Sequence, residues 1–224
     1  MGKVHTFQPA KKENKIMIER NYPWLETGET LLCFGDSLTA AANGYVSMLE
    51  EKLSERKITV INAGRGGDKT PWALTRLQSD VIERKPDAVS IFLGANDAAV
   101  GRGRWADEPR VEPAAYQNNL IWMVHLCKII GNIKKFSIAT PTWRFEAQTY
   151  AEHGDILTPY CAAAREAAED SGSWLVPLDT AFEGYWMEHR AENRDGYLLT
   201  RDGVHVTEQG NRLIADTMLK TWYL

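Results

Sequence analysis

The sequence predicts an α/β protein with a mostly parallel sheet. From Thr30 onward, short apolar runs alternate with longer segments of helical spacing, which is the pattern of βαβ units. The 224 residues suffice for one substantial core but are few for two, and no internal repeat or Ser/Gly/Pro-rich linker divides them. We therefore expect a single domain over residues 30–224, preceded by an N-terminal extension over residues 1–29.

Five short apolar runs are the candidate strands. They are Thr30–Phe34, Thr59–Asn62, Ala88–Leu93, Phe136–Ala139 and Trp174–Leu178. The expected helices between them are Gly44–Arg56, Pro71–Arg84, Pro113–Ile130 and Pro159–Ser171. Pro71 and Pro113 suit first-turn positions, where a missing N–H leaves no intrahelical bond unmade. A last helix should begin near Thr207, because this threonine, followed by Glu and Gln, can cap a helix N-terminus.

Two polar segments, Gly101–Glu112 and Thr142–Leu157, interrupt this pattern after the third and fourth strands. Loops at the carboxyl ends of parallel strands are where open α/β sheets bind ligands. Trp105, Trp143 and Arg144 are therefore candidate substrate-binding residues. Simple packing of the loops by these side chains is an equal alternative, and the sequence leaves open whether the loops form a lid or bind substrate.

The composition limits the classes of partner and the cellular compartment that we expect for the protein. A net charge of −4 argues against a nucleic-acid partner, because phosphate binding relies on concentrated Lys and Arg. Cys33, Cys127 and Cys161 lie in apolar or alanine-rich stretches and predict buried thiols rather than a disulfide framework. We see no apolar signal region and no membrane-spanning stretch, so we expect a cytoplasmic protein without membrane insertion. Whether the extension packs on the domain or on a second copy in a homo-oligomer stays open.

The motif Gly35-Asp36-Ser37 follows the first predicted strand directly. It places a serine at the turn that leaves the strand, where the hydroxyl can project at the carboxyl edge of the sheet. An ordinary turn in which Asp36 or Ser37 caps a helix is the alternative, and it is favoured for this motif alone. Asp36 is also a candidate substrate-binding residue.

A glycine-rich loop over residues 62–68 follows the second strand and contains Gly64, Gly66 and Gly67. Such a loop can bring backbone N–H groups close to an anion, although a flexible turn is the alternative. It is not a phosphate loop, because the Lys-Thr pair that follows is preceded by Asp68 and not by the glycine of that motif.

Two further motifs end near the same edge of the sheet. Asn96 follows the third strand and can donate a side-chain N–H there, although a plain turn explains it as well. Asp202 stands three residues before His205, just ahead of the last predicted helix. On a tight turn its carboxylate can reach the imidazole Nδ1, which leaves Nε2 free to act as a base. An Asp-Gly turn beside a surface histidine is the alternative for this motif alone.

Together the four motifs resemble the SGNH/GDSL hydrolases. The family's four blocks carry Ser, Gly, Asn and His, which Ser37, Gly67, Asn96 and His205 match in order, while Asp202 matches the aspartate of the D-x-x-H block. Gly67 is chosen among the three glycines because an aspartate follows it, as an acidic segment does in the family. The resemblance covers the chain after the N-terminal extension.

The resemblance implies a three-layer, flavodoxin-like fold with a five-stranded parallel sheet in the order 2-1-3-4-5. It also implies a serine esterase that forms an acyl-enzyme, with Ser37 as nucleophile, His205 as base and Asp202 as its orienting carboxylate. The Ser37 N–H, the Gly67 N–H and the Asn96 amide would form the oxyanion hole. This chemistry needs no cofactor, and the other histidines have no second ligand at metal spacing.

The substrate is less well defined by the sequence. The lack of a long apolar segment near the site favours short acyl groups, acetyl above all, on a carbohydrate or a small alcohol. A lysophospholipase or thioesterase-type acyl hydrolase is an alternative. So is a non-catalytic binding protein on the same scaffold, because fold alone does not fix function. A nucleotide-binding regulator is a remote third, given the acidic charge and the failed phosphate-loop match.

Overall fold

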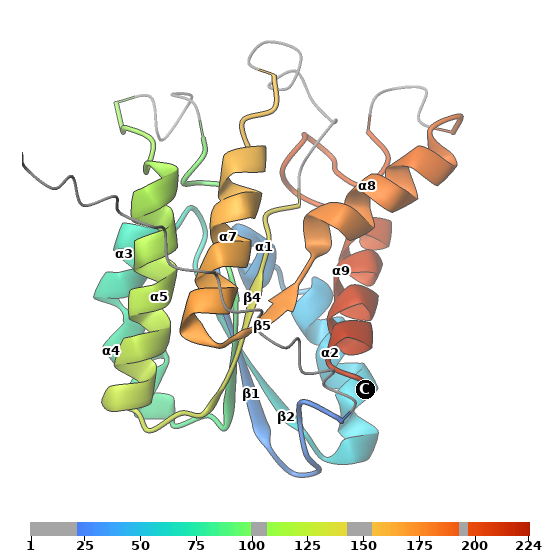
Figure 1. Ribbon diagram of the computed structural model, residues 1–224. Coiled ribbons are helices and arrows are strands. Elements are labelled where there is room, and N and C mark those ends of the chain that lie inside the picture. The colour runs from blue at the N-terminus through green and yellow to red at the C-terminus, as the bar shows by residue number, and fades with distance from the viewer. Residues whose placement is uncertain (1–21, 100–106, 143–153, 193–196) are drawn as a thin grey trace, which may run out of the picture.

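The computed structural model describes residues 22–99, 107–142, 154–192 and 197–224, which form a five-stranded sheet between two layers of helices (Figure 1). The strands are β1 (Thr30–Gly35), β2 (Thr59–Gly64), β3 (Ala88–Phe92), β4 (Lys135–Ala139) and β5 (Trp174–Val176). All neighbours pair in parallel, in the order β2-β1-β3-β4-β5. The α/β class and the strand order expected above are confirmed.

Successive residues of the strands point into two separate hydrophobic cores, one on each face of the sheet. Leu32 and Phe34 of β1 belong to the first core, whereas Leu31 and Cys33 belong to the second. The helices that cover the first face are α3 (Thr70–Thr75), α4 (Leu77–Asp80), α5 (Pro113–Ile129) and α7 (Thr158–Ser171), with the short η2 (Ile82–Arg84). The second face is covered by α2 (Tyr45–Leu53), α8 (Leu178–His189) and α9 (Glu208–Thr221), and η1 (Ser54–Arg56) extends α2.

The carboxyl ends of β1, β2 and β3 meet at one level. In the register of the sheet, Gly35 lies opposite both Gly64 and Phe92. The chain then turns from β1 into the short helix α1 (Ser37–Ala40). A Cβ atom on Gly64 would lie 2.2 Å from the backbone nitrogen of Ala40, so the approach of β2 to α1 requires glycine. The loops after the three strands therefore leave the sheet side by side.

Three elements differ from the sequence prediction. The expected helix over Pro71–Arg84 is three short pieces, α3, α4 and η2, and the first break falls at Arg76. The expected strand Trp174–Leu178 ends at Val176, because Pro177 offers no N–H for a sheet bond. The helix α8 that begins directly afterwards was not expected. The Thr207 cap of α9 is confirmed by its hydroxyl, which accepts a hydrogen bond from the Gly210 N–H at 3.2 Å.

The described part of the expected N-terminal extension, residues 22–29, packs on the domain. Trp24 and Leu25 are buried in the second core. The ring of Trp24 lies 4.8 Å from that of Trp222, and the backbone N–H of Trp24 donates to the Trp222 carbonyl at 2.9 Å. These residues tie the start of the described chain to the end of α9.

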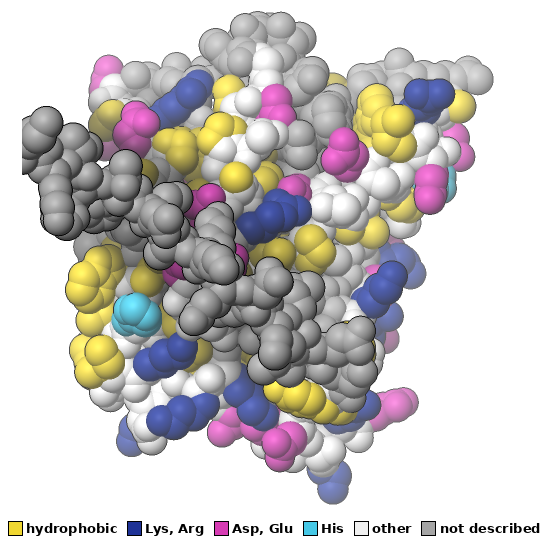
Figure 2. Space-filling view, in the orientation of Figure 1, with side chains coloured by type: hydrophobic (Ala, Val, Ile, Leu, Met, Phe, Trp, Pro, Cys, Tyr) yellow, Lys and Arg dark blue, Asp and Glu magenta, His cyan; other side chains and the backbone are white. Residues whose placement is uncertain are grey.

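Charged and hydrophobic side chains are both dispersed over the surface. Figure 2 shows acidic, basic and hydrophobic side chains scattered over one face, with some of the hydrophobic ones over α5. On that helix and the residue after it, Trp122, Ile129 and Ile130 are all more than half exposed. The three cysteines are buried thiols, as expected. In the described ranges, none of the helices is both long enough and apolar enough to cross a membrane.

Candidate active site

Ser37 stands at the point where β1 gives way to α1. Asp36 precedes it as the N-cap of that helix, and its Oδ1 accepts the Leu38 N–H at 3.0 Å. The capping alternative raised by the sequence therefore holds for Asp36, and the same turn leaves Ser37 at the carboxyl edge of the sheet. Asp36 is only 2% exposed, and burial raises the pKa of its carboxyl group to about 7. Direct contact of Asp36 with a substrate is therefore not favoured.

The residues from Asp202 to His205 form a closed turn before α9. Thr200 and Val206 pair across it as an antiparallel bridge, and Gly203 adopts a positive φ of 89° that favours glycine. Asp202 Oδ1 accepts the N–H of Val204 at 2.9 Å and that of His205 at 2.7 Å. The carboxylate thus fixes the turn that carries the imidazole.

The structure brings Ser37, His205 and Asp202 into one hydrogen-bonded chain. His205 Nε2 lies 3.3 Å from Ser37 Oγ across 168 positions of sequence, and His205 Nδ1 lies 2.7 Å from Asp202 Oδ2. Burial acts to raise the pKa of Asp202, but the hydrogen bonds from the His205 ring and from two backbone N–H groups outweigh it and hold that pKa below its ordinary value. Asp202 is therefore ionised at neutral pH and can orient the imidazole.

The glycine-rich loop passes beside the serine. A Cβ atom on Gly66 would lie 4.0 Å from the Ser37 Cβ, and Gly67 adopts a positive φ of 80°. Within the described part of the chain, the backbone N–H groups of Ser37 and Gly67 donate to no other protein atom. Both donors are thus free to bind a substrate oxygen.

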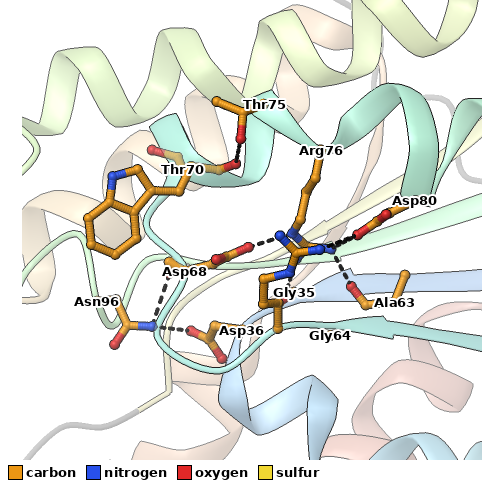
Figure 3. A network of polar contacts seen from close by, with 12 residues as sticks. Gly35, Asp36, Ala63, Gly64, Asp68, Thr70, Thr75, Arg76, Asp80 and Asn96 are labelled. Carbon is orange, nitrogen blue, oxygen red and sulfur yellow. Dashed lines mark hydrogen bonds and ion pairs between the residues drawn. The ribbon is translucent and has the colours of Figure 1, made fainter.

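Asn96 lies next to the same loop, and both of its side-chain N–H groups face protein acceptors (Figure 3). Its Nδ2 donates to the backbone oxygen of Asp68 at 3.0 Å and to Asp36 Oδ2 at 3.3 Å. Asn96 is 5% exposed, so the amide is held in a fixed orientation. The structure therefore places Asn96 against Asp36 and Asp68, the neighbours in sequence of Ser37 and Gly67.

Two charged residues beneath these donors were not singled out by the sequence. Asp97 is fully buried, accepts the Thr70 N–H at 3.0 Å, and has its pKa raised to about 6 by burial. Arg76 is 4% exposed and lies between the ends of β1 and β2. A signal existed for Arg76: it falls on the apolar stripe of its helical segment, between the buried Ala73 and Leu77.

The other candidate substrate-binding residues lie outside the described ranges, and the other described histidines lie on helices α5 and α8. Trp105, Trp143 and Arg144 are outside the residues that the structure describes. His125 is exposed on α5, and His189 stacks on Tyr185 at 4.0 Å in the last turn of α8. In the described ranges, no group of three or more His, Cys, Asp or Glu side chains is arranged to hold a metal ion.

Known proteins are similar to this chain over nearly its whole length. The GDSL-like Lipase/Acylhydrolase family model matches residues 33–213. A GDSL esterase/lipase of Arabidopsis thaliana is 30% identical over 222 residues, spanning 86% of this chain and 84% of that protein. The isoamyl acetate-hydrolyzing esterase 1 homolog of Homo sapiens is 27% identical, spanning 82% and 77%. The crystal structure of the acetyl xylan esterase AlAXEase is 28% identical with a TM-score of 0.74, covering 85% of this chain and 98% of its own.

Proposed function

Because the chain belongs to the GDSL-like lipase/acylhydrolase family and is a carboxylic ester hydrolase, we propose that it is a serine esterase that cleaves short-chain acyl esters through an acyl-enzyme. The observation that carries the proposal is the chain of contacts from Asp202 through His205 to Ser37. A serine hydroxyl is a weak nucleophile by itself, and a base held by a third group is what activates it.

In the first half of the reaction, Ser37 Oγ attacks the ester carbonyl carbon. A bond forms between Oγ and that carbon while the hydroxyl proton passes to His205 Nε2. The 3.3 Å separation suits this transfer, because such contacts tighten when substrate binds. The tetrahedral intermediate then expels the alcohol, which takes the proton from His205, and Ser37 is left acylated.

In the second half, water attacks the acyl-enzyme and gives its proton to His205. The ester bond to Ser37 Oγ breaks, the serine regains the proton, and the carboxylic acid leaves. Asp202 stays ionised throughout. It holds the imidazole in one orientation and stabilises the imidazolium that forms twice in each cycle.

The oxyanion would be held by the N–H groups of Ser37 and Gly67 and by the Asn96 amide. The first two are unoccupied within the described residues. The longer of the two Asn96 contacts, to Asp36 Oδ2 at 3.3 Å, is the one that an oxyanion would share or replace. The raised pKa of Asp36 favours its neutral form, which spares the oxyanion a nearby negative charge.

Acetyl is the acyl group we propose, carried by a carbohydrate or a small alcohol. Two of the similar proteins are an isoamyl acetate-hydrolyzing esterase homolog and an acetyl xylan esterase, and the latter has the same fold over most of this chain. Small acyl groups also need little apolar surface, which agrees with the lack of a long apolar segment near the motifs.

A chain-length series tests the proposal directly. We expect kcat/KM for p-nitrophenyl esters to be highest for acetate and to fall for butyrate, octanoate and dodecanoate, with acetylated xylo-oligosaccharides as the carbohydrate arm. The Ser37→Ala variant is the control for background hydrolysis. A kcat/KM that rises with chain length would point to a long-chain acyl hydrolase instead. Hydrolysis no faster than that of Ser37→Ala on every ester would favour a binding protein on this scaffold.

A further inference from the structure

We infer that Arg76 is a positioning residue that sets the geometry of the oxyanion hole from beneath. The inference rests on the proposed function, because it assigns Arg76 to the same site. Arg76 touches neither the triad nor the space above Ser37. It contacts instead backbone and side-chain atoms of residues that neighbour the oxyanion donors in the sequence.

The guanidinium of Arg76 donates four hydrogen bonds to acceptors in four segments of the chain (Figure 3). Nη2 donates to the Gly35 carbonyl at 2.8 Å, and Nη1 donates to the Ala63 carbonyl at 2.9 Å. Nε donates to Asp68 Oδ2 at 2.5 Å, and Nη1 also pairs with Asp80 Oδ2 at 3.0 Å. The group therefore links the end of β1, the end of β2 and the glycine-rich loop.

Two of these acceptors, Gly35 and Asp68, lie close in sequence to an oxyanion donor. Gly35 is two residues before Ser37, whose N–H is the first donor. Asp68 follows Gly67, whose N–H is the second donor, and the Asp68 carbonyl accepts the Asn96 amide at 3.0 Å. Movement of Asp68 would thus displace two donors together. Arg76 contacts both the Asp68 side chain and the Gly35 carbonyl at the end of β1, so it links the loop that carries two donors to the strand end that precedes the third.

Burial makes this link rigid. The side chains of Arg76 and Asp68 are 4% and 5% exposed, and the Arg76 guanidinium carbon lies 4.3 Å from the centre of the Phe34 ring. A buried bidentate or multidentate arginine has its donors in one plane, whereas a lysine offers a single ammonium on a flexible stem. Lysine could keep the charge at position 76 but could not reach these acceptors at once.

A second arginine supplies a matched control. Arg165 on α7 makes a fork–fork pair with Asp179, with both N···O distances 2.8 Å. This pair joins α7 to α8, and Arg165 hydrogen-bonds to Cys161, Asp179 and Thr180 rather than to the triad or the oxyanion donors. Arg165→Lys therefore disturbs a second arginine–carboxylate pair, also with a buried carboxylate, that has no contact with the proposed site.

The experiment compares Arg76→Lys and Arg165→Lys in hydrogen exchange and in esterase kinetics. We expect faster amide exchange in a peptide covering residues 62–70 for Arg76→Lys and no change there for Arg165→Lys. On p-nitrophenyl acetate, kcat should fall on the order of 10–10²-fold for Arg76→Lys with KM nearly unchanged, because misplaced donors weaken binding of the transition state. The pH profile should keep its shape, since His205 and Asp202 are untouched.

Several results would overturn the inference. Unchanged exchange over residues 62–70 in a folded Arg76→Lys protein would show that Arg76 does not hold the loop. Faster exchange over residues 62–70 together with a wild-type kcat would show that the loop geometry maintained by Arg76 does not matter for catalysis. If Arg76→Lys does not fold, Asp68→Asn weakens the same contact with little change in shape, and it should reproduce both effects at smaller size. Failure of the esterase proposal is recognised separately, by a wild-type protein that hydrolyses no ester more rapidly than Ser37→Ala does.

Discussion

The two sides of the site differ sharply in their exposure to solvent. On the oxyanion side, Asp36, Asp68, Arg76 and Asn96 are each at most 5% exposed and are hydrogen-bonded to one another. On the base side, the side chains of Asp202 and His205 are both 55% exposed, and a five-residue turn closed by the Thr200–Val206 bridge carries them. One edge of the sheet therefore combines a buried, fixed half with a solvent-exposed half.

The difference corresponds to the role that we propose for each half. Donors aimed at a developing charge act most strongly when they are fixed and shielded from water, because they then need no reorganisation during the reaction. A base that gains and loses a proton twice in a cycle can remain near solvent, provided that its orientation is held. Here the orientation is held locally, since one carboxylate binds both the ring and the backbone of His205.

The largest effect should come from the contact that joins the two halves. Ser37→Ala removes the nucleophile and His205→Ala removes its base, so either should lower kcat by about 10⁴–10⁶-fold. The double variant should be hardly worse than either single one, because the two residues act as a unit. Steady-state kinetics on p-nitrophenyl acetate measures all three. Losses that multiply in the double variant would mean that Ser37 and His205 act independently.

Asp202→Asn should have the next largest effect. The amide keeps roughly the place of the carboxylate but loses the charge that orients and stabilises the imidazolium, so kcat should fall by about 10³–10⁴-fold. Because the pair is exposed, the thermal unfolding midpoint should change little. A variant that retains more than a tenth of wild-type kcat would show that the base side needs no fixed carboxylate.

Asn96→Ala tests the buried half with the nucleophile and base intact. The loss of one oxyanion donor should lower kcat by about 10²–10³-fold and leave KM nearly unchanged. The variant should also be less stable, because the Asp68 carbonyl and the Asp36 carboxyl group lose a buried donor. Full kcat in this variant would remove Asn96 from the oxyanion hole.

The smallest effect concerns stability rather than rate. Burial raises the pKa of Asp36 to about 7 from its ordinary value of 3.8, so at intermediate pH the folded protein keeps a proton that the unfolded chain has lost. This stabilising contribution is complete below the unfolded pKa and is lost as the pH rises through about 7. The unfolding midpoint of the wild type should therefore fall between pH 5 and pH 8.

Asp36→Asn cannot ionise, so its midpoint should fall less over the same range. Between pH 5 and pH 8, the unfolding midpoint of the wild type should fall by roughly 4 °C or more beyond the fall of the Asp36→Asn midpoint. This follows because 1 kcal/mol corresponds to about 2–4 °C in a chain of this size. Differential scanning calorimetry at the two pH values checks this. Asp97, whose pKa is raised to about 6, also lowers the stability of the folded protein as the pH rises, and this contribution should remain in the Asp36→Asn variant. An equal fall of the unfolding midpoint in the wild type and in Asp36→Asn would show that Asp36 does not titrate in this range.

The residues of the proposed site that the sequence identified all depend on local patterns. Ser37, Gly67, Asn96 and His205 each lie in a short motif near the end of an expected strand or just before the last helix, and parallel strands bring such ends together. The same reasoning gave the class of the sheet. The strand order came from the family resemblance rather than from the apolar runs themselves.

The elements that were missed depend on tertiary contacts or on an overlooked signal. The break in the helix at Arg76 is marked by no proline or glycine in the sequence, and at this position the side chain reaches the carbonyls of Ala63 and Gly35 at the ends of β2 and β1. Helix α8 did have a signal, since Pro177 ends β5 and Asp179 follows in the first turn of the helix. The burial of Asp36, which argues against contact with substrate, likewise follows from packing and not from its motif.

The central claim is that Ser37 is a nucleophile activated by His205, and covalent labelling tests it most directly. A fluorophosphonate should add once to the native protein by displacement of fluoride, and peptide mapping by mass spectrometry should place the adduct on Ser37 Oγ. The same reagent should label His205→Ala far more slowly, and should not label Ser37→Ala or the unfolded wild type. An adduct on another residue of the native protein, or labelling of His205→Ala at the wild-type rate, would contradict the claim.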